Sequence, residues 1–529
     1  MRRAGLGIAL LVIGCARTPV PRPTVPLYHD LGSLTVPIST KVPLAQQYFD
    51  QGVRLSYAFN HAEAIRSFEQ AARLDPRCAI CHWGIALALG PNINAPMDSA
   101  SGVEAWTELE RARALRSHAN PRERALIDAL GARYRPNPSP DRAALDSGYA
   151  VAMGRVANDF PDDPEAATLY AEALMDLRPW DYWGGPGRPR PGTATIARTL
   201  ERVLAADSTH PGACHLYIHL YEATEPARAL PCAERLAALM PGAGHIVHMP
   251  AHIYVRIGRY ADAIAHNQHA THADSAFAAS ERVSPAYALL YVPHNFHFLG
   301  FAAMLAGQAD VAIEAGRRTV ETMPRDGAAG VPEFQPLLAF HQLMLLKFGR
   351  WKELIDLPLP DSTLPVARAV AEYARGTALA ATGRVGEAKG LLGAIGRRSA
   401  GLSGVASGIV SIAGHSLAGE IAARTRQWPS AERELRAAMA IEDGFTYMEP
   451  PWWIEPVRQP LGALLLAAGK AAAAETVYRE DLARFPKNVW SLVGLERSLR
   501  AQGRKDPAVE AEVRAAVALA GEAVAGSHR

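Results

Sequence analysis

The chain has 529 residues and a formal net charge of +2, and 49% of its residues are hydrophobic. This apolar content and balanced charge exclude a disordered or fibrous protein, and they argue against nucleic-acid binding driven by bulk charge. Nucleic acid is therefore not among the expected partners.

Residues 1–15 have the features of an export signal. Arg2 and Arg3 precede an apolar run from Leu6 to Ile13, which is too short to cross the ~30 Å hydrocarbon core of a bilayer. The run ends in the letters VIGC, which resemble the lipobox of bacterial lipoproteins. The resemblance implies that Cys15 receives a lipid and becomes the mature N-terminus. A plain signal peptide with an accidental cysteine is the alternative.

Residues 16–43 are predicted to be a proline-rich tether. Pro19, Pro21, Pro23 and Pro26 favour extended chain and disfavour helix. Because residue 16 is Ala and not Asp, resemblance to the sorting pattern of such lipoproteins implies the outer membrane, facing the periplasm. We therefore expect a cell-envelope protein that meets the membrane only through its lipid anchor.

Helical repeats begin at residue 44. The segment AQQYFDQGVRLSYAFNHAEAIRSFEQAARLDP places Gly52, Ala64, Phe68, Ala71 and Pro76 at the spacing of a 34-residue helix-turn-helix unit, and it resembles a tetratricopeptide repeat (TPR). Similar units follow at 247–273, 294–320, 338–357, 370–392, 411–441, 457–486 and 491–520. Those at 247–392 carry Gly-Arg or Gly-Gln at the turn between their helices.

The predicted fold class is therefore all-α, a TPR-like solenoid in which antiparallel helix pairs form a superhelix. Strand signals are scarce. The solenoid is expected over 44–520, with N-terminal repeats at 44–176, His-rich central repeats at 194–325, C-terminal repeats at 334–520, and a tail at 521–529. Three longer connections carry aromatic or Asn residues and are interpreted as lids or as packed inter-repeat loops: 89–101, 177–191 and 441–456.

Five cysteines are present. Cys78, Cys81 and His82 form a CxxCH motif, to which c-type haem is covalently attached with His as axial ligand; a structural disulfide or two buried small residues are the alternatives. Cys214 and Cys232 lie 18 residues apart, about the separation between neighbouring antiparallel helices, so they are a candidate disulfide.

Histidine is concentrated in the central repeats. Eleven of the 18 histidines lie between His210 and His297, where proportional sampling would place about three. His215, His219 and Glu222 share one helical face, as do the histidines of the next unit. Aligning the following units on Gly258 and Gly307 puts His294 at the slot of His245, and His297 at the slot of His248.

These residues predict a mononuclear or dinuclear transition-metal site in the concave groove. The candidate ligands are His215, His219, Glu222, His245, His248, His252, His294 and His297. Nitrogen-rich ligation favours Zn, Cu, Fe or Ni over Mg and Ca. The alternatives are a groove for an anionic small ligand and a scaffold that holds a protein or peptide partner without metal. Enzyme status stays open.

Other residues near the cluster receive separate predictions. His266, His269 and His272 fall on the second helix of their unit, so we expect them on the convex side in solvent. Asn295, Tyr217 and Tyr254 are candidates for hydrogen bonds that orient the ligating rings, with plain packing as the alternative.

Overall fold

The computed structural model describes residues 25–137, 141–281 and 283–520. Over these ranges the chain is helical, and the only strand-like pairings are two isolated bridges. The all-α, TPR-like solenoid is confirmed. The predicted signal peptide, the lipidation site Cys15 and the tail at 521–529 lie outside the described residues.

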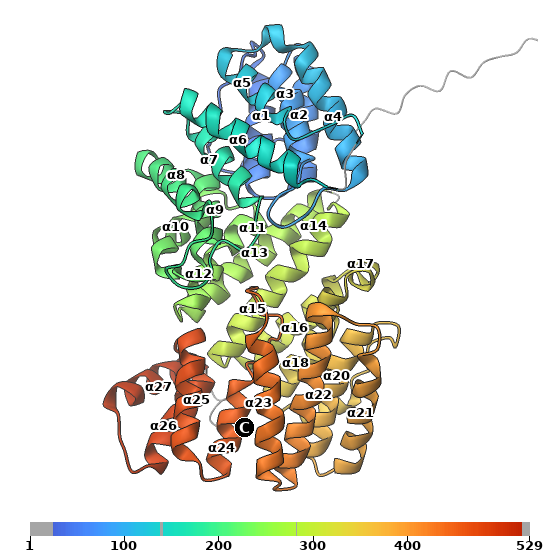
Figure 1. Cartoon of the computed structure of the whole chain (residues 1–529), viewed down its shortest axis with the longest axis vertical. Coiled ribbons are helices and arrows are strands. Elements are labelled where there is room, and N and C mark those ends of the chain that lie inside the picture. Colours follow the sequence, from blue (N-terminus) through green and yellow to red (C-terminus); the bar gives the residue numbers. More distant parts are fainter. Residues whose placement is uncertain (1–24, 138–140, 282, 521–529) are drawn as a thin grey trace, which may run out of the picture.

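The helices follow one another as pairs along the chain (Figure 1). The N-terminal block contains α1 (Pro43–Tyr57), α2 (His61–Leu74), α3 (Ala79–Ala88), α4 (Ser99–Ala114), η1 (Arg116–His118), α5 (Pro121–Leu130), α6 (Ala143–Asp159), α7 (Pro164–Met175) and α8 (Thr193–Ala206). The central block contains α9 (Pro211–Tyr221), α10 (Pro226–Leu239), α11 (Gly244–His248), α12 (Pro250–Arg256), α13 (Tyr260–Ser280), α14 (Pro285–Leu290), α15 (Val292–Ala306), α16 (Ala309–Thr322) and α17 (Arg325–Gly330). The C-terminal block contains η2 (Pro332–Ala339), α18 (Phe340–Lys347), α19 (Trp351–Asp356), α20 (Pro365–Ala381), α21 (Val385–Arg398), α22 (Gly404–Arg424), α23 (Trp428–Asp443), α24 (Arg458–Ala467), α25 (Ala471–Arg484), α26 (Val489–Ala501) and α27 (Pro507–Ala520).

Small residues allow the paired helices to approach closely. A Cβ atom built on Gly52 of α1 would lie 2.5 Å from the ring of Phe68 in α2, and one built on Gly84 of α3 would lie 2.8 Å from it. Phe68 is 1% exposed and fills the space between the three helices. The packing role that the repeat pattern assigned to Gly52 and Phe68 is confirmed.

The turns between paired helices need a left-handed residue. Gly258 and Gly307 have φ of 75° and 79°, a conformation that glycine adopts without steric cost. In the first repeat, the same turn position is held by Phe59, with φ of 55°. A bulky residue is unusual there, and its ring lies at the site described below.

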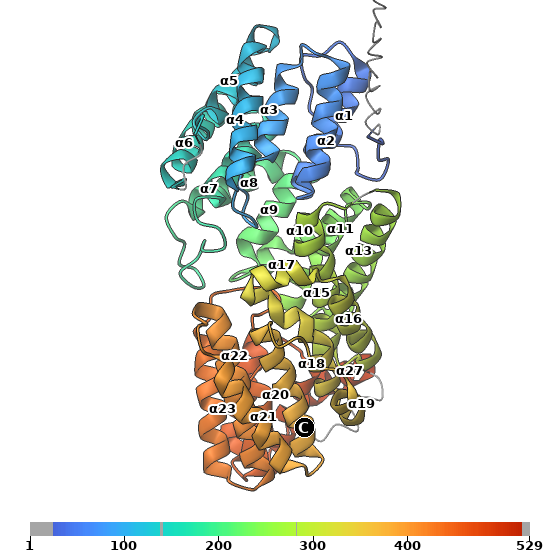
Figure 2. The same ribbon diagram turned by 90° about the vertical axis from the view of Figure 1, so that its right-hand side faces the viewer.

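The C-terminal repeats return to the central helices (Figure 2). Helices α26 and α27 contact α15. Trp490 donates from Nε1 to the Met304 carbonyl at 2.7 Å, and Tyr260 donates from its hydroxyl to the Pro486 carbonyl at 2.8 Å. The superhelix therefore brings the loop at 441–456 toward the central block.

Part of the predicted tether is packed against the repeats. Val25 and Val36 are 3% and 5% exposed. The Val36 N–H donates to Asp50 Oδ1 at 2.8 Å, and the Asp30 carbonyl accepts from the Gly242 N–H at 2.8 Å. The prediction of a tether is thus wrong for residues 25–42, since their backbone groups find partners on α1 and on the loop after α10.

Two helical stretches are long and apolar enough to cross a membrane by length and composition alone, Pro285–Ala306 and Gly404–Arg424. Their apolar windows are 67% and 56% buried inside the fold. Core helices of globular proteins pass the same test, and both stretches pack as parts of the solenoid.

The cysteine predictions are revised by the structure. Cys78 and Cys81 form a disulfide at the start of α3, so neither sulfur is available for a thioether bond to haem, and His82 donates from Nδ1 to Glu108 Oε2 at 2.7 Å. The haem prediction is therefore wrong, and the structural-disulfide alternative holds. Cys214 and Cys232 do lie side by side, but as free thiols with their Sγ atoms 2.8 Å apart.

Candidate metal centre

Six of the predicted histidines gather in two groups of three. The ligand atoms within each group lie within 4.8 Å of one another. The first trio is His215, His219 and His245, and the second trio is His248, His252 and His294. They come from α9, α11, α12 and α15.

The trios lie inside the fold. Five of the six histidines are at most 3% exposed, and His294 is half-buried. The sequence predicted ligands lining an open groove, whereas the structure encloses them between the N-terminal block, the central helices and the loop at 441–456. Burial removes water that would compete for the ring nitrogens.

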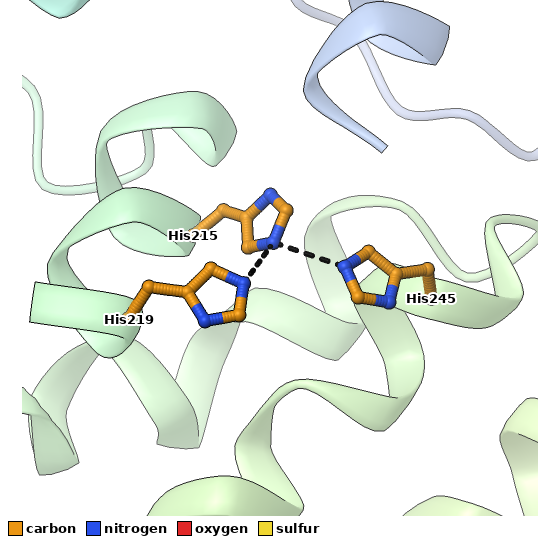
Figure 3. Close-up of side chains that lie close together, drawn as sticks. All are labelled: His215, His219 and His245. Carbon is orange, nitrogen blue, oxygen red and sulfur yellow. Dashed lines mark hydrogen bonds between the residues drawn. The ribbon is translucent and has the colours of Figure 1, made fainter. Parts of the chain in front are cut away.

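The first trio points three Nε2 atoms toward one place (Figure 3). His215 Nε2 lies 3.0 Å from His219 Nε2 and 3.1 Å from His245 Nε2. Nitrogens that share a tetrahedral ion at ~2.0–2.1 Å lie ~3.3 Å apart. The spacing therefore fits ligands of one ion. His215 and His219 are four residues apart on α9, which stacks them on one face.

The second trio repeats this arrangement. His248 Nε2 lies 2.8 Å from His252 Nε2 and 3.1 Å from His294 Nε2. Pro250 separates α11 from α12, yet the four-residue step from His248 to His252 keeps both rings together. His245 and His248 lie three residues apart on α11, and His245 belongs to the first trio whereas His248 belongs to the second.

Hydrogen bonds at Nδ1 fix the tautomers of the facing rings. His215 Nδ1 lies 2.7 Å from the Tyr57 carbonyl oxygen, which only accepts, so Nδ1 carries the proton and Nε2 a bare lone pair. His248 donates from Nδ1 to Asn267 Oδ1 at 2.7 Å, and the Asn267 amide nitrogen donates in turn to the Ala263 carbonyl. Nε2 of His215 and Nε2 of His248 therefore each present a lone pair to the neighbouring rings of their trio.

Glu222 supports both trios and is not placed as a ligand. Its Oε1 accepts from His219 Nδ1 at 2.9 Å, and its Oε2 is in contact with His252 Nδ1. Burial alone would raise the pKa of Glu222, but His252 and His219 lower it to about 2, so the carboxylate is ionised. The prediction of Glu222 as a ligand is wrong because both oxygens are directed to the far side of the rings.

The neutral form of His215, His245 and His248 is favoured at physiological pH. Burial, together with neighbouring histidines, holds the pKa of His215, His245 and His248 well below the usual value. An additional proton held between two of these rings is therefore disfavoured near pH 7, so it does not relieve the repulsion between their lone pairs. A cation held by three nitrogens would do so.

Aromatic rings wall the two trios. The Phe59 ring centroid lies 4.5 Å from that of His215 and 5.4 Å from that of His245, and Trp180 lies edge-on to His219 at 4.9 Å. Phe59 and Trp180 both have positive φ, 55° and 64°. Backbone strain at bulky residues is frequent at functional sites, and here it places both rings against the first trio.

Residues of all three long connections lie near the histidines. Asn94 of the loop at 89–101 donates to the Tyr291 hydroxyl at 3.3 Å, and the Tyr291 ring lies 4.7 Å from that of His245. Trp180 belongs to the loop at 177–191. In the loop at 441–456, burial raises the pKa of Glu449 to about 7, and Glu222 and His252 act on its carboxyl electrostatically.

The remaining predicted residues lie elsewhere. His297 belongs to neither trio, because its ring is directed to Phe340, with centroids 4.5 Å apart, and burial lowers its pKa to about 3. Asn295 donates to Asp274 Oδ2 at 2.7 Å, and Tyr217 donates to Glu201 Oε1 at 3.1 Å. The Tyr254 ring lies under the Arg259 guanidinium. None of these three orients a trio ring by the contacts found, so the packing alternative holds for them.

The convex-side histidines fall largely as predicted. His269 and His272 on α13 are exposed, whereas His266 is half-buried and lies 3.2 Å from the Val247 carbonyl through Nδ1. Sequence reasoning missed the supporting groups Tyr57, Asn267 and Phe59. For Phe59 a signal existed, since the first repeat has Phe at the turn position where later repeats have Gly.

No protein-family model matches the chain, and no curated protein matches it by sequence. Among solved structures, it is similar to the human IFIT1 dimer with m7Gppp-AAAA, at 15% identity over 91% of each chain with a TM-score of 0.35. It is also similar to the TPR domain of P58(IPK), at 11% identity over 87% of this chain and 99% of that one with a TM-score of 0.23. Yeast Tom70 matches at 10% identity over 89% and 92%, with a TM-score of 0.31. Values this low concern the helical-repeat architecture alone.

Proposed function

We propose that the chain binds two transition-metal ions, one in each histidine trio. The observation that carries the proposal is the convergence of three Nε2 atoms in each trio, 2.8–3.1 Å apart, while the Nδ1 protons of His215, His219 and His248 are directed to Tyr57, Glu222 and Asn267. Nε2 of His215 and Nε2 of His219 both carry lone pairs and lie 3.0 Å apart, so these two rings repel one another, and a shared cation turns that repulsion into ligation.

The donor set selects the class of ion. Three imidazole nitrogens suit Zn, Cu, Fe or Ni and disfavour Mg and Ca, which prefer oxygen. Three protein ligands also leave a position on a four-coordinate ion for an exogenous molecule, as in catalytic sites. The site could therefore bind or activate a small ligand.

Metal content measured on matched variants tests the proposal. The chain without residues 1–15 is loaded with each candidate ion, desalted and analysed for metal per chain. We expect about two ions in the wild type and about one each in His245→Ala and His294→Ala, because each change removes one ligand from one trio. His269→Ala, which changes an exposed histidine of α13, is the control and should keep two.

Two results would contradict the proposal. One is a wild type that retains none of the four metals after loading. The other is a metal content that stays the same in both ligand variants, because the ions would then bind elsewhere.

We also propose export to the cell envelope with a lipid on Cys15. The apolar run before Cys15 and the disulfide between Cys78 and Cys81 support this, since disulfides persist in oxidising compartments. Metabolic labelling with a radiolabelled fatty acid should mark the wild type in the outer-membrane fraction and not Cys15→Ala. Equal labelling of both would contradict the lipid assignment.

A protein or peptide partner is a second candidate function, located in the C-terminal repeats. A groove of about 500 Å³ there is lined by aromatic and charged residues, among them Trp428, Trp490, Glu420, Arg424 and Arg497. Partner capture from envelope extracts that is lost in Trp428→Ala would support it. Capture that is unchanged in that variant would place the partner elsewhere.

A further inference from the structure

A small pocket opens beside the second trio. It has a volume of about 90 Å³ and is bordered by His294 and His297 of α15. Trp452 and Trp453 of the loop at 441–456 also line it. The pocket therefore joins a predicted lid to the candidate metal centre.

The walls of this pocket are flat and mostly apolar. Phe334 of η2, Phe340 of α18 and the two tryptophans supply aromatic faces and edges. Such surfaces favour an aromatic ring over an aliphatic one, because ring stacking and edge contacts add to the burial of apolar area. A cavity of ~150 Å³ holds one benzene molecule. At about 90 Å³ the pocket is smaller than that cavity, so it takes at most one ring, incompletely enclosed, and excludes a peptide.

Two buried polar atoms of the pocket-lining residues have no hydrogen-bond partner among the described residues. They are Oε1 of Glu449 and Nε1 of Trp452. Glu449 is only 4% exposed, and its other oxygen accepts from the Tyr447 hydroxyl at 3.2 Å. Buried polar groups are normally paired, so an unpaired acceptor and an unpaired donor beside one pocket point to a ligand that supplies both.

A hydroxyl group supplies both at once. It donates one proton, which suits the Glu449 oxygen, and it accepts through a lone pair, which suits the Trp452 N–H. Combined with the aromatic walls and the size of the pocket, this describes a phenol.

We propose that the pocket binds a single-ring phenolic molecule between the loop at 441–456 and α15. The assignment of this molecule as the ligand of the metal centre rests on the proposed function, since His294 belongs to the second trio. Binding of the ring itself depends only on the pocket.

Calorimetric titration with phenol tests the inference on the full chain lacking residues 1–15, both metal-loaded and metal-free. Phenol should bind in both forms, and cyclohexanol and benzene should bind several-fold more weakly, because one lacks the flat ring and the other the hydroxyl. Glu449→Met should weaken phenol binding about 10–100-fold and Trp452→Phe about 3–10-fold, from the loss of one charged and one neutral hydrogen bond. Trp428→Phe, in the distant groove, is the control and should bind phenol as the wild type does.

Failure of this inference is distinguishable from failure of the metal proposal. No phenol binding at millimolar concentration in a protein that holds two ions overturns the phenol site alone. Equal binding of cyclohexanol, or unchanged binding in both Glu449→Met and Trp452→Phe, also overturns it. Phenol binding with the expected variant effects in a protein that retains no metal supports the pocket and overturns the metal centre.

Discussion

Glu222→Gln should separate the two metal sites. In the wild type, Oε1 accepts from His219 Nδ1 at 2.9 Å and Oε2 contacts His252 Nδ1, so the carboxylate serves one histidine in each trio. A glutamine has one oxygen and one NH2 group, so it accepts from only one of them. At the other histidine an N–H would face an N–H, and the proton must move to Nε2, where it blocks the metal-binding lone pair.

The magnitude follows from the value of such supporting groups. Loss of a hydrogen-bond partner behind a ligating histidine costs ~10–100-fold in metal affinity, or ~1.4–2.8 kcal/mol at 1.4 kcal/mol per tenfold. We expect Glu222→Gln to weaken one trio by about this factor and the other far less. Glu222→Ala, which removes both acceptors, should weaken both.

Competition with a chromogenic chelator resolves the two affinities as separate steps. Glu201→Gln, which changes a carboxylate that pairs with Tyr217 and Arg228, is the matched control and should leave both steps unchanged. An equal loss at both steps in Glu222→Gln, or no loss at either, would refute the shared-acceptor reasoning.

Three further predictions concern other parts of the chain. Phe59→Gly should relieve a strained turn, yet it should speed metal loss to a chelator because it uncovers the first trio. Arg426→Gly, at another turn with positive φ (57°), is the control and should relieve strain without changing the rate of metal loss. Equal rates of metal loss in the two variants would refute the covering role of Phe59. Burial raises the pKa of Glu442 to about 8, above its unfolded value of 4.5, so the stability it contributes is full below pH 4.5 and is lost as the pH rises through 8. Between pH 5 and 9, the thermal unfolding midpoint of Glu442→Gln should fall less than that of the wild type, by on the order of a few degrees. The same fall in both proteins would contradict this. Mild oxidation should join Cys214 and Cys232 in a disulfide, because their Sγ atoms are 2.8 Å apart. Thiol titration should then find neither free thiol, and two remaining thiols would contradict the contact.

Repeat spacing and turn chemistry made the fold predictable. Gly258 and Gly307 take the left-handed turn position that the alignment of units assumed, and the aligned slots of His245 and His294 each supply one member of a trio. The pattern could not show which histidines share an ion, because that depends on how α9, α11 and α15 pack.

Helical steps explain the division that the sequence missed. A step of four residues turns a helix by about 40°, and a step of three turns it about 60° the other way. The four-residue pairs, His215 with His219 and His248 with His252, stay within one trio. His245 and His248, which are three residues apart, belong to different trios. His297 lies three residues after His294, and this step directs its ring away from both trios.

Contacts between distant parts of the chain were beyond sequence reasoning. Glu449 lies near Glu222 only because the C-terminal repeats return to α15, and a repeat pattern does not report how far a superhelix closes. Residues 25–42 read as a tether from their prolines, yet Asp50 and Gln51 supply partners for the backbone N–H groups of Val36 and Tyr28.

Anomalous diffraction from crystals of the metal-loaded chain, recorded at the absorption edge of the bound ion, tests the central claim most directly. Two peaks are expected, one about 2.0–2.1 Å from the Nε2 atoms of His215, His219 and His245, and one at the same distance from those of His248, His252 and His294. Peaks centred on Glu222 or at surface histidines, or no peak in a loaded crystal, would contradict a dinuclear centre built from two histidine trios.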